Sequence, residues 1–279
     1  MTSVGDAATV RPRAPGDVSL FWTLFNWSWI IFFMGLGALL CVTLGPIAIL
    51  FGDRQRLVAH SMLAWANRCQ VRWHPTCKLF LTGVENLAGA PFILCPNHQS
   101  YADVVYIYSL PVQFRWIIKR ELFWVPFFGM SMRVAGYPAI SRGDVDSAQG
   151  LLDRVAGYLR AGVPVLNFPE GSRSRTGELQ RFHTGAARMA ILNAVPLVPV
   201  GVVGTARLLP RGSVTFPSRA RVGIHIGTPI PTKGLSLDDL RSVTRQLRDA
   251  VLAAKAEAER SIYPQGNTNE RPDVASWSP

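Results

Sequence analysis

A long run without any charged side chain follows the first residues of the chain. No Asp, Glu, Lys or Arg occurs in residues 18–52, and the apolar stretch Leu20–Leu44 is 25 residues long. As an α-helix this stretch would be about 37 Å long, which exceeds the roughly 30 Å hydrocarbon core of a bilayer. Trp22, Trp27 and Trp29 lie near its start, as aromatic residues do at membrane interfaces. The sequence therefore predicts a membrane-inserted helical segment.

Two geometries are open for this segment. Gly45-Pro46 is expected to interrupt the helix before Ile47–Phe51, which leaves either a single span or two helices that enter one leaflet and return. Asp53–Arg72 is expected to lie amphipathically on the membrane surface. A cleaved signal peptide is not expected, because the apolar stretch is too long and lacks a small-residue cleavage site with a basic start before it.

The distribution of basic residues indicates partners and orientation. Four arginines follow the apolar stretch and outnumber the basic residues before it: Arg54, Arg56, Arg68 and Arg72. The positive-inside rule therefore predicts that the main domain lies on the cytoplasmic face of the inner or plasma membrane. Residues 53–220 hold 19 Lys and Arg against 9 Asp and Glu, which suits anionic lipid headgroups or phosphorylated substrates. Nucleic acid is not an expected partner, because no zinc-finger or RNP signature accompanies the charge.

Composition indicates a folded domain attached to a membrane. Hydrophobic residues make up 48% of the chain and charged residues 17%, against about 25% charged in typical soluble domains. Residues 1–17 and 261–279 are polar and contain Pro, and we expect both to be disordered. Between them we expect a membrane-associated helical segment at 18–72 and an α/β domain at 73–260. The four cysteines show no CxxC pair and are expected to be reduced packing residues: Cys41, Cys69, Cys77 and Cys95.

From about Lys78 the hydrophobic pattern alternates between strands and helices. Strands are expected at Lys78–Val84, Pro91–Cys95, Phe114–Ile118, Val163–Phe168, Leu197–Val203 and Arg221–Ile226. Helices are expected at Val145–Arg160, at Thr184–Ala194 and from Ser236, where Asp239 three residues on completes a capping box. This alternation is typical of an α/β fold.

The strongest local signal is the segment Asn97–Asp103, which follows an expected strand and a Pro. His98 would then stand at a strand end, where a substrate can reach it. Its pKa range suits proton abstraction from a hydroxyl, and Asp103 could hold the tautomer if it lay in the first turn of a following helix. Ser100-x-x-Asp103 is also a capping box, which would explain the carboxylate without catalysis.

Further cations follow apolar stretches, where they could meet an anionic headgroup. They are Lys119, Arg142 and, in the segment Phe168–Arg175, Arg173 and Arg175. Guanidinium groups offer planar forks that match phosphate oxygens. In the same segment Gly171 permits a tight turn and Glu170 can orient an Arg or a substrate hydroxyl. Leu122–Phe128 is dense in large apolar side chains and either lines an acyl-chain tunnel or belongs to the core.

These segments together resemble the glycerolipid acyltransferase family, typified by lysophosphatidate acyltransferase, over roughly residues 78–230. The N-H-x4-D motif of the family is met by Asn97, His98 and Asp103, and its Gly-to-Arg motif by Gly136, Ile140 and Arg142. Its F-P-E-G-[T/S]-R-S motif is met in full by Phe168–Ser174, and its V-P-[IV]-x-P motif by Val195–Pro199, with Leu197 in the usual β-branched position. The departures are Pro138-Ala139, where an aliphatic-aromatic pair is common, and His183, where Lys or Arg is frequent.

The resemblance implies a mixed, mostly parallel sheet flanked by helices. It implies that His98 is the general base toward a glycerol hydroxyl, oriented by Asp103. It also implies that Lys119, Arg142 and Arg173 hold the acceptor phosphate and that the backbone near Gly171 assists the oxyanion. Asn97 and Glu170 complete the predicted substrate-binding set. The acyl donor would be the thioester of acyl-CoA or acyl carrier protein, with no cofactor, no metal and no acyl-enzyme intermediate.

Acylation of lysophosphatidate to phosphatidate is thus the leading functional hypothesis. The alternatives are acylation of another lyso-lipid, such as a lyso-ornithine lipid or lysophospholipid, and a non-catalytic membrane protein that binds lipid. A serine hydrolase is not expected, because the sequence contains no G-x-S-x-G elbow. The sequence does not determine the acyl chain preference or the oligomeric state.

Overall fold

The computed structural model describes residues 19–89, 91–141, 145–174 and 177–263. The segment 1–17, expected to be disordered, lies outside this range, as does 264–279 of the expected C-terminal tail. Arg142 and Arg175 also lie outside the described residues.

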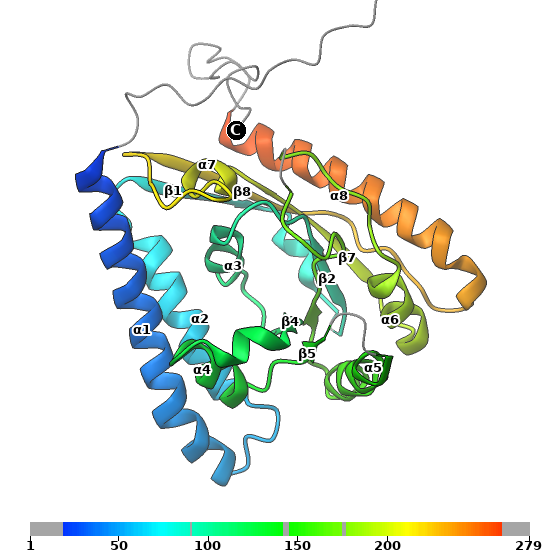
Figure 1. Ribbon diagram of the computed structural model, residues 1–279. Coiled ribbons are helices and arrows are strands. Elements are labelled where there is room, and N and C mark those ends of the chain that lie inside the picture. Colours follow the sequence, from blue (N-terminus) through cyan, green and yellow to red (C-terminus); the bar gives the residue numbers. More distant parts are fainter. Residues whose placement is uncertain (1–18, 90, 142–144, 175–176, 264–279) are drawn as a thin grey trace, which may run out of the picture.

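A six-stranded sheet forms the centre of the α/β domain (Figure 1). In the order of the sheet, the strands are β1 (Cys77–Thr82), β8 (Ala220–Ile226), β7 (Leu197–Val203), β2 (Ile93–Pro96), β6 (Val165–Leu166) and β3 (Arg115–Trp116). Every neighbouring pair is parallel except β7 with β8, which is antiparallel. A separate parallel pair is formed by β4 (Ile118–Lys119) and β5 (Ala139–Ile140). The mixed, mostly parallel sheet is confirmed.

Helices cover both faces of this sheet. One face carries α5 (Val145–Arg160), α6 (Gly185–Asn193) and α8 (Leu240–Ile262), and the other carries α2 (Leu57–Arg72) and α3 (Ala102–Ile107). All seven residues of β7 are buried, as expected of a strand with helices on both sides. The short helices η2 (Val84–Leu87), α7 (Thr205–Leu208) and η4 (Leu237–Asp239) join these elements. The capping box of Ser236 and Asp239 is confirmed.

The contact between α8 and β7 depends on Gly201. A β-carbon at this position would lie 2.2 Å from the carbonyl carbon of Ala254. Because the obstacle is the backbone of a packed helix, no side-chain rotation can relieve the clash. The absence of a side chain on Gly201 therefore sets how closely α8 approaches the sheet.

Gly201→Ala is expected to lower the free energy of unfolding by about 1–3 kcal/mol or more, the usual cost of overpacking. Gly157→Ala in α5 is the matched control, because a β-carbon there meets nothing within 4 Å. That change should raise stability by about 0.5–1 kcal/mol through helix propensity. Thermal unfolding in detergent followed by circular dichroism checks both. Equal stability of the two variants would contradict the close-packing argument.

The N-terminal segment forms one continuous helix, α1 (Leu20–Leu50). The expected interruption at Gly45-Pro46 is wrong: Pro46 lies inside the helix, and Gly45 sits so close to α4 (Phe128–Val134) that a β-carbon would lie 2.5 Å from Val134 Cγ1. Packing of α1 against α2 and α4 thus outweighs the hydrogen bond lost at Pro46. By length and composition α1 is a candidate membrane helix.

The helix α2 packs between α1 and the α/β domain, and the expected contact of Asp53–Arg72 with a membrane surface stays a prediction. Polar contacts attach it to the domain: Arg68 donates to the carbonyl oxygens of Tyr108 and Leu110 at 3.0 and 2.6 Å. The buried His60 lies 2.9 Å from the Tyr137 hydroxyl through Nδ1. Burial lowers the pKa of His60 well below its ordinary value, so this contact is made by a neutral ring. The α1–α2 hairpin is therefore part of the domain.

Candidate active site

The candidate site begins where β2 ends. Asn97, the first residue after β2, is 1% exposed, and its side-chain amide pairs with the backbone of Val202 in β7. Asn97 Nδ2 donates to Val202 O at 2.9 Å, and Val202 N donates to Asn97 Oδ1 at 2.7 Å. These contacts continue the β2–β7 pairing by one step and fix the loop that carries His98. The predicted substrate-binding role of Asn97 stays a prediction, since its amide faces β7.

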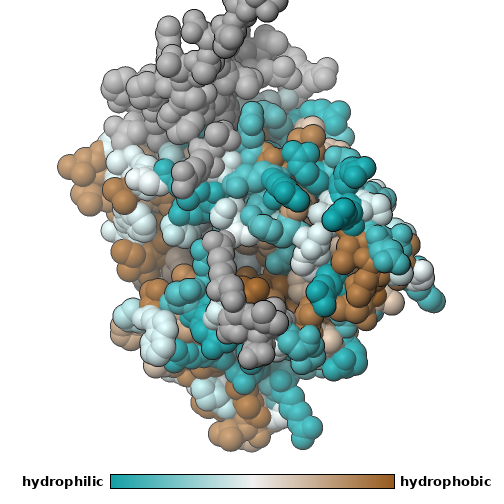
Figure 2. Space-filling model, turned by 45° about the vertical axis from the view of Figure 1, so that its right-hand side comes forward, coloured by the Kyte–Doolittle hydropathy of each residue, from teal (hydrophilic) through white to brown (hydrophobic). Residues whose placement is uncertain are grey.

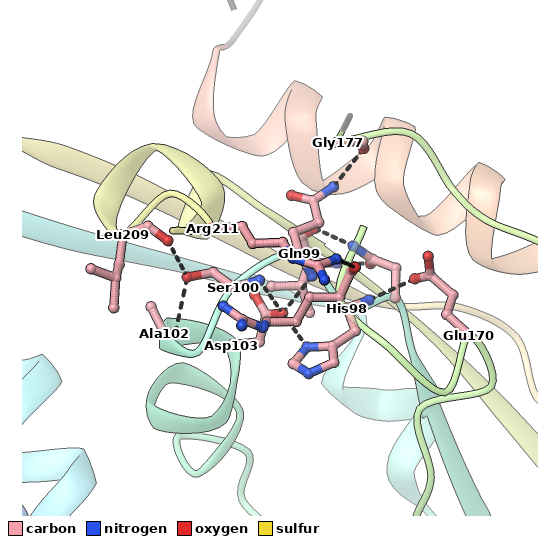
Figure 3. Close-up of polar contacts among 12 residues, drawn as sticks. His98, Gln99, Ser100, Ala102, Asp103, Glu170, Gly177, Leu209 and Arg211 are labelled. Carbon is pink, nitrogen blue, oxygen red and sulfur yellow. Dashed lines mark hydrogen bonds and ion pairs between the residues drawn. The ribbon is translucent and has the colours of Figure 1, made fainter. Parts of the chain in front are cut away.

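His98 and Asp103 form a close pair, with 2.8 Å between His98 Nδ1 and Asp103 Oδ2 (Figure 3). Asp103 lies in the first turn of α3 and is fully buried. The same Oδ2 accepts the backbone N–H groups of Gln99 and Ser100 at 2.7 and 2.9 Å. Because an ionised carboxylate only accepts, His98 Nδ1 carries the proton and Nε2 is left as a proton acceptor. The helix α3 has Tyr101 as its N-cap and no side-chain cap, so the capping box expected of Ser100 and Asp103 is not formed; the carboxylate binds the loop before the helix and orients the imidazole.

The segment Phe168–Ser174 holds His98 from three directions. The ring of Phe168 stacks on the imidazole, with 3.9 Å between centroids and an interplanar angle of 19°. Glu170 Oε1 accepts the His98 backbone N–H at 2.7 Å (Figure 3), and Ser174 N donates to the His98 carbonyl oxygen at 2.8 Å. The two segments that the sequence singled out are thus joined around one histidine.

Glu170 is 3% exposed, and both of its carboxylate oxygens accept backbone N–H groups. Its Oε2 accepts from Gln180 N at 3.0 Å. Burial raises the pKa of Glu170, against the opposing effect of the hydrogen bonds from His98 and Gln180. This geometry suits a residue that positions His98 at least as well as the predicted contact with substrate.

The pKa of Glu170 gives a pH dependence with a definite sign. An acid whose folded-state pKa is raised favours the folded state at low pH, and that contribution is lost as the pH rises through the folded-state pKa. The free energy of unfolding of the wild type minus that of Glu170→Gln should therefore fall as the pH rises above the ordinary value of 4.5. Unfolding at a series of pH values measures this difference, with the exposed Glu85 as the control in Glu85→Gln. A difference that grows with pH would contradict the dominance of burial.

A cavity of about 1330 Å³ opens beside His98 and Phe168. Its lining is mostly apolar and includes Ile30 and Met34 of α1 and Leu63 of α2. Leu122 and Phe128 also line it, and both pack against the hydrophobic core. The segment Leu122–Phe128 therefore contributes both to the cavity lining and to the core, and an acyl-chain tunnel stays a prediction. The volume and lining are suited to an acyl chain.

Cationic side chains form part of the cavity lining. Arg173 stacks its guanidinium 3.6 Å from the centroid of the Tyr101 ring, and its carbonyl oxygen accepts from Arg211 Nη1 at 2.5 Å. Lys119 and Arg188 line the same cavity. Figure 2 shows one face of the molecule, with teal polar residues over much of the surface and brown apolar residues at its left side, its right side and its foot.

The structure brings together most of the predicted site residues. His98, Lys119, Glu170, Gly171 and Arg173 all line the cavity. The Gly171 N–H donates to Phe168 O at 3.0 Å, with φ at +66°, so in this conformation that N–H is engaged in the turn and the oxyanion role stays a prediction. Within the described part of the chain, no cluster of three or more His, Cys, Asp or Glu is placed to hold a metal ion.

Sequence reasoning missed Tyr101, Arg188 and Arg211. Tyr101 lies within the segment Asn97–Asp103, but nothing in that pattern assigns it a role. No local signal marks Arg188 or Arg211, because each is an ordinary basic residue until the fold carries it to the cavity. Arg211 lies 38 residues beyond Arg173 in sequence and meets it through the loop between α7 and β8.

Comparison with known proteins identifies the family. Residues 78–203 match the family model described as Acyltransferase. A relative from Caenorhabditis elegans is 30% identical over 84% of this chain and 83% of its own length. The chain belongs to the lysophosphatidate acyltransferase family. The 1-acyl-sn-glycerol-3-phosphate acyltransferase BAT2 of Brassica napus chloroplasts is 33% identical over 68% of this chain.

This chain matches different shares of the full length of other lysophosphatidate acyltransferase family members. The chain spans 56% of the Brassica napus relative and 52% of an Arabidopsis thaliana relative. The crystal structure of the 1-acyl-sn-glycerophosphate acyltransferase PlsC from Thermotoga maritima resembles this one with a TM-score of 0.63 and 25% sequence identity. That likeness covers 85% of this chain and 96% of the other, so it includes the N-terminal helices as well as the sheet.

Proposed function

We propose that this protein transfers a fatty acyl group from acyl-CoA or acyl carrier protein to the free hydroxyl of lysophosphatidate, giving phosphatidate. The His98–Asp103 pair, 2.8 Å apart at the edge of the cavity, is the observation that carries the proposal. A cavity whose lining combines many apolar side chains with Lys119, Arg173 and Arg188 suits an amphipathic acceptor with a charged headgroup. The names of the relatives point to the same substrate.

The reaction follows from the tautomer of His98. Nε2 takes the proton of the acceptor hydroxyl while that oxygen attacks the thioester carbonyl carbon, and the carbonyl electrons move to the oxygen. When the tetrahedral intermediate collapses, the C–S bond breaks and the departing thiolate takes the proton from the imidazolium. Asp103 stabilises the imidazolium between these steps, as a buried carboxylate does in a catalytic triad.

The lyso-lipid that the protein acylates with the highest kcat/KM decides between the candidate functions. Purified protein would be assayed with radiolabelled acyl-CoA and, separately, acyl carrier protein, against lysophosphatidate, a neutral lysophospholipid and a lyso-ornithine lipid. We expect lysophosphatidate to give the highest kcat/KM. Higher kcat/KM with the lyso-ornithine lipid would reassign the acceptor, and transfer to none of the three would support a role in binding lipid alone.

Arg173→Ala is expected to lower kcat/KM for lysophosphatidate by about 10- to 100-fold, chiefly through KM. The magnitude corresponds to the loss of a charge-assisted hydrogen bond of about 1.5–3 kcal/mol. Arg241→Ala is the matched control, because Arg241 is exposed on α8 and lies outside the cavity lining. Steady-state kinetics with lysophosphatidate and with monoacylglycerol, which lacks the phosphate, measure the effect. Equal losses for both acceptors would argue against phosphate recognition by Arg173.

We further propose that the α1–α2 hairpin holds the enzyme in one leaflet, with the domain on the cytoplasmic face. Buried residues of α1 extend from Thr23 to Gly45, so a perpendicular span would draw the attached domain into the bilayer. Leu20, Phe21, Ile31 and Leu50 are exposed on the outer side of α1. Arg56 and Arg68 donate to backbone carbonyl oxygens within the protein. The positive-inside argument for a cytoplasmic domain therefore depends mainly on Arg54 and Arg72.

A further inference from the structure

A second apolar element reaches the surface beside α1. It joins η3 (Arg120–Trp124) to α4, and four of its side chains are exposed: Trp124 by 78%, Val125 by 44%, Phe127 by 81% and Met130 by 54%. We call these four residues the aromatic turn. Single exposed apolar side chains are ordinary, but a contiguous group of large ones marks a contact surface.

The turn is held in a fixed shape that directs its side chains outward. Phe127 has φ 58° and ψ −50°, a backbone conformation that costs a bulky residue about 1–3 kcal/mol. Phe128 N donates to Pro126 O at 2.6 Å and Gly129 N to Val125 O at 2.7 Å. A β-carbon on Gly129 would lie 2.2 Å from the Phe123 carbonyl oxygen, which shows how tightly η3 and α4 are folded together.

The other side of this element is fixed to α1 and to the cavity. Cys41 Sγ donates to Ser131 O at 3.4 Å, and Gly45 lies against Val134. Leu44 and Ile47, on either side of Gly45, are 41% and 50% exposed. The exposed surface of α1 and the aromatic turn are therefore neighbours, with α4 packed between them and the cavity.

We propose that the aromatic turn is a second membrane-contact element, which inserts into the lipid interface next to α1. The inference rests on the proposed function at a membrane. Its occupant is a lipid bilayer rather than a protein, because aromatic and basic residues are combined as in interfacial anchors. Arg133 lies over the rings of Phe123 and Trp124, at 5.3 Å from each centroid, and Lys119 and Arg120 are exposed where η3 begins.

With this membrane contact, the segment from η3 to α4 has two roles. Leu122 and Phe128 line the cavity while Trp124 and Phe127 face outward. The wall of the cavity near Lys119 is then the part of the domain that touches the membrane. A lysolipid acceptor leaving the leaflet would meet the basic residues of the cavity after a short displacement.

The test places an environment-sensitive nitrobenzoxadiazole label on a single introduced cysteine of the full chain. Phe127→Cys carries the test label, and Leu252→Cys on α8 is the matched control, since Leu252 is 50% exposed on the other side of the sheet from α1 (Figure 1). Both are made in Cys69→Ser, because the other three cysteines are buried. Doxyl-labelled phosphatidylcholine in phosphatidylcholine–phosphatidylglycerol vesicles is the quencher.

We expect the label at position 127 to be quenched at least about threefold more than the label at 252, as for an interfacial group. Equal quenching at the two positions would overturn the proposal. So would a label at position 127 that a soluble protein partner protects from quenching by the doxyl-labelled lipid. Ile31→Cys on α1 distinguishes the two ways to fail: quenching at 31 without quenching at 127 removes the second contact and leaves the hairpin in the membrane. Met130→Cys repeats the measurement if the strained backbone at 127 does not tolerate the change. Quenching requires no acyl transfer, so its outcome is separate from that of the proposed activity.

Discussion

His98→Ala is expected to lower kcat for acyl transfer by about 10²- to 10⁴-fold, the range associated with loss of a general base. The acceptor hydroxyl then loses the imidazole Nε2 proposed to take its proton, while the cations and the apolar lining remain. KM for lysophosphatidate should change little. The assay is single-turnover and steady-state transfer of radiolabelled acyl chains in membranes or detergent.

The control for this change is another histidine. His225 lies on β8, contacts Thr82 Oγ1 at 3.0 Å and does not line the cavity. His225→Ala should leave kcat within about twofold, as expected for a surface position away from the site. Unchanged acyl transfer in His98→Ala would refute the proposed base, and a folded state checked by circular dichroism separates loss of chemistry from loss of structure.

Asp103→Asn is the second change expected to have a large effect. The carboxamide oxygen can still accept from Gln99 N or Ser100 N, so the loop is retained. The amide NH2 group, however, presents donors to His98 Nδ1, which favours the tautomer with the proton on Nε2. A protonated Nε2 cannot accept the hydroxyl proton, so kcat should fall by about 10²- to 10⁴-fold, as in the triad variant with the same substitution.

The chain contains a matched control for the capping role that the Ser100-x-x-Asp103 pattern predicts. Asp239 stands in the same Ser-x-x-Asp pattern, and Ser236 N donates to its Oδ2 at 2.9 Å. Asp239→Asn should cost about 0.5–2 kcal/mol of stability at most and leave kcat unchanged. If Asp103 were only a cap, the two variants would behave alike. We expect them to have similar stability and very different activity.

The losses of kcat expected for His98→Ala and Asp103→Asn should not add. His98 and Asp103 act as a unit, and the tautomer of an absent imidazole has no consequence. The double variant His98→Ala with Asp103→Asn should therefore have about the activity of His98→Ala alone. A further loss in the double variant would give Asp103 a role that does not pass through His98.

Local patterns in the sequence predicted most of the secondary structure. Alternation and helical spacing are properties of neighbouring residues, and the capping box at Ser236 is contained in four of them. The same holds for His98 and Asp103, whose five-residue separation is closed by the short loop that leads into α3. The predicted break at Pro46 failed for the complementary reason: the local cost of the proline is outweighed by helix packing that the sequence does not display.

The sequence by itself determined a long apolar helix that is a candidate for membrane insertion, an α/β domain and a histidine–carboxylate pair, because each depends on residues close together in the chain. Only the tertiary structure showed how His98 is held, since Glu170 and Ser174 reach it across more than 70 residues. It also separated the sides of Leu122–Phe128, one lining the cavity and the other exposed. Spacing along a chain limits which residues can meet locally, but contacts between distant segments depend on how the sheet and its helices pack.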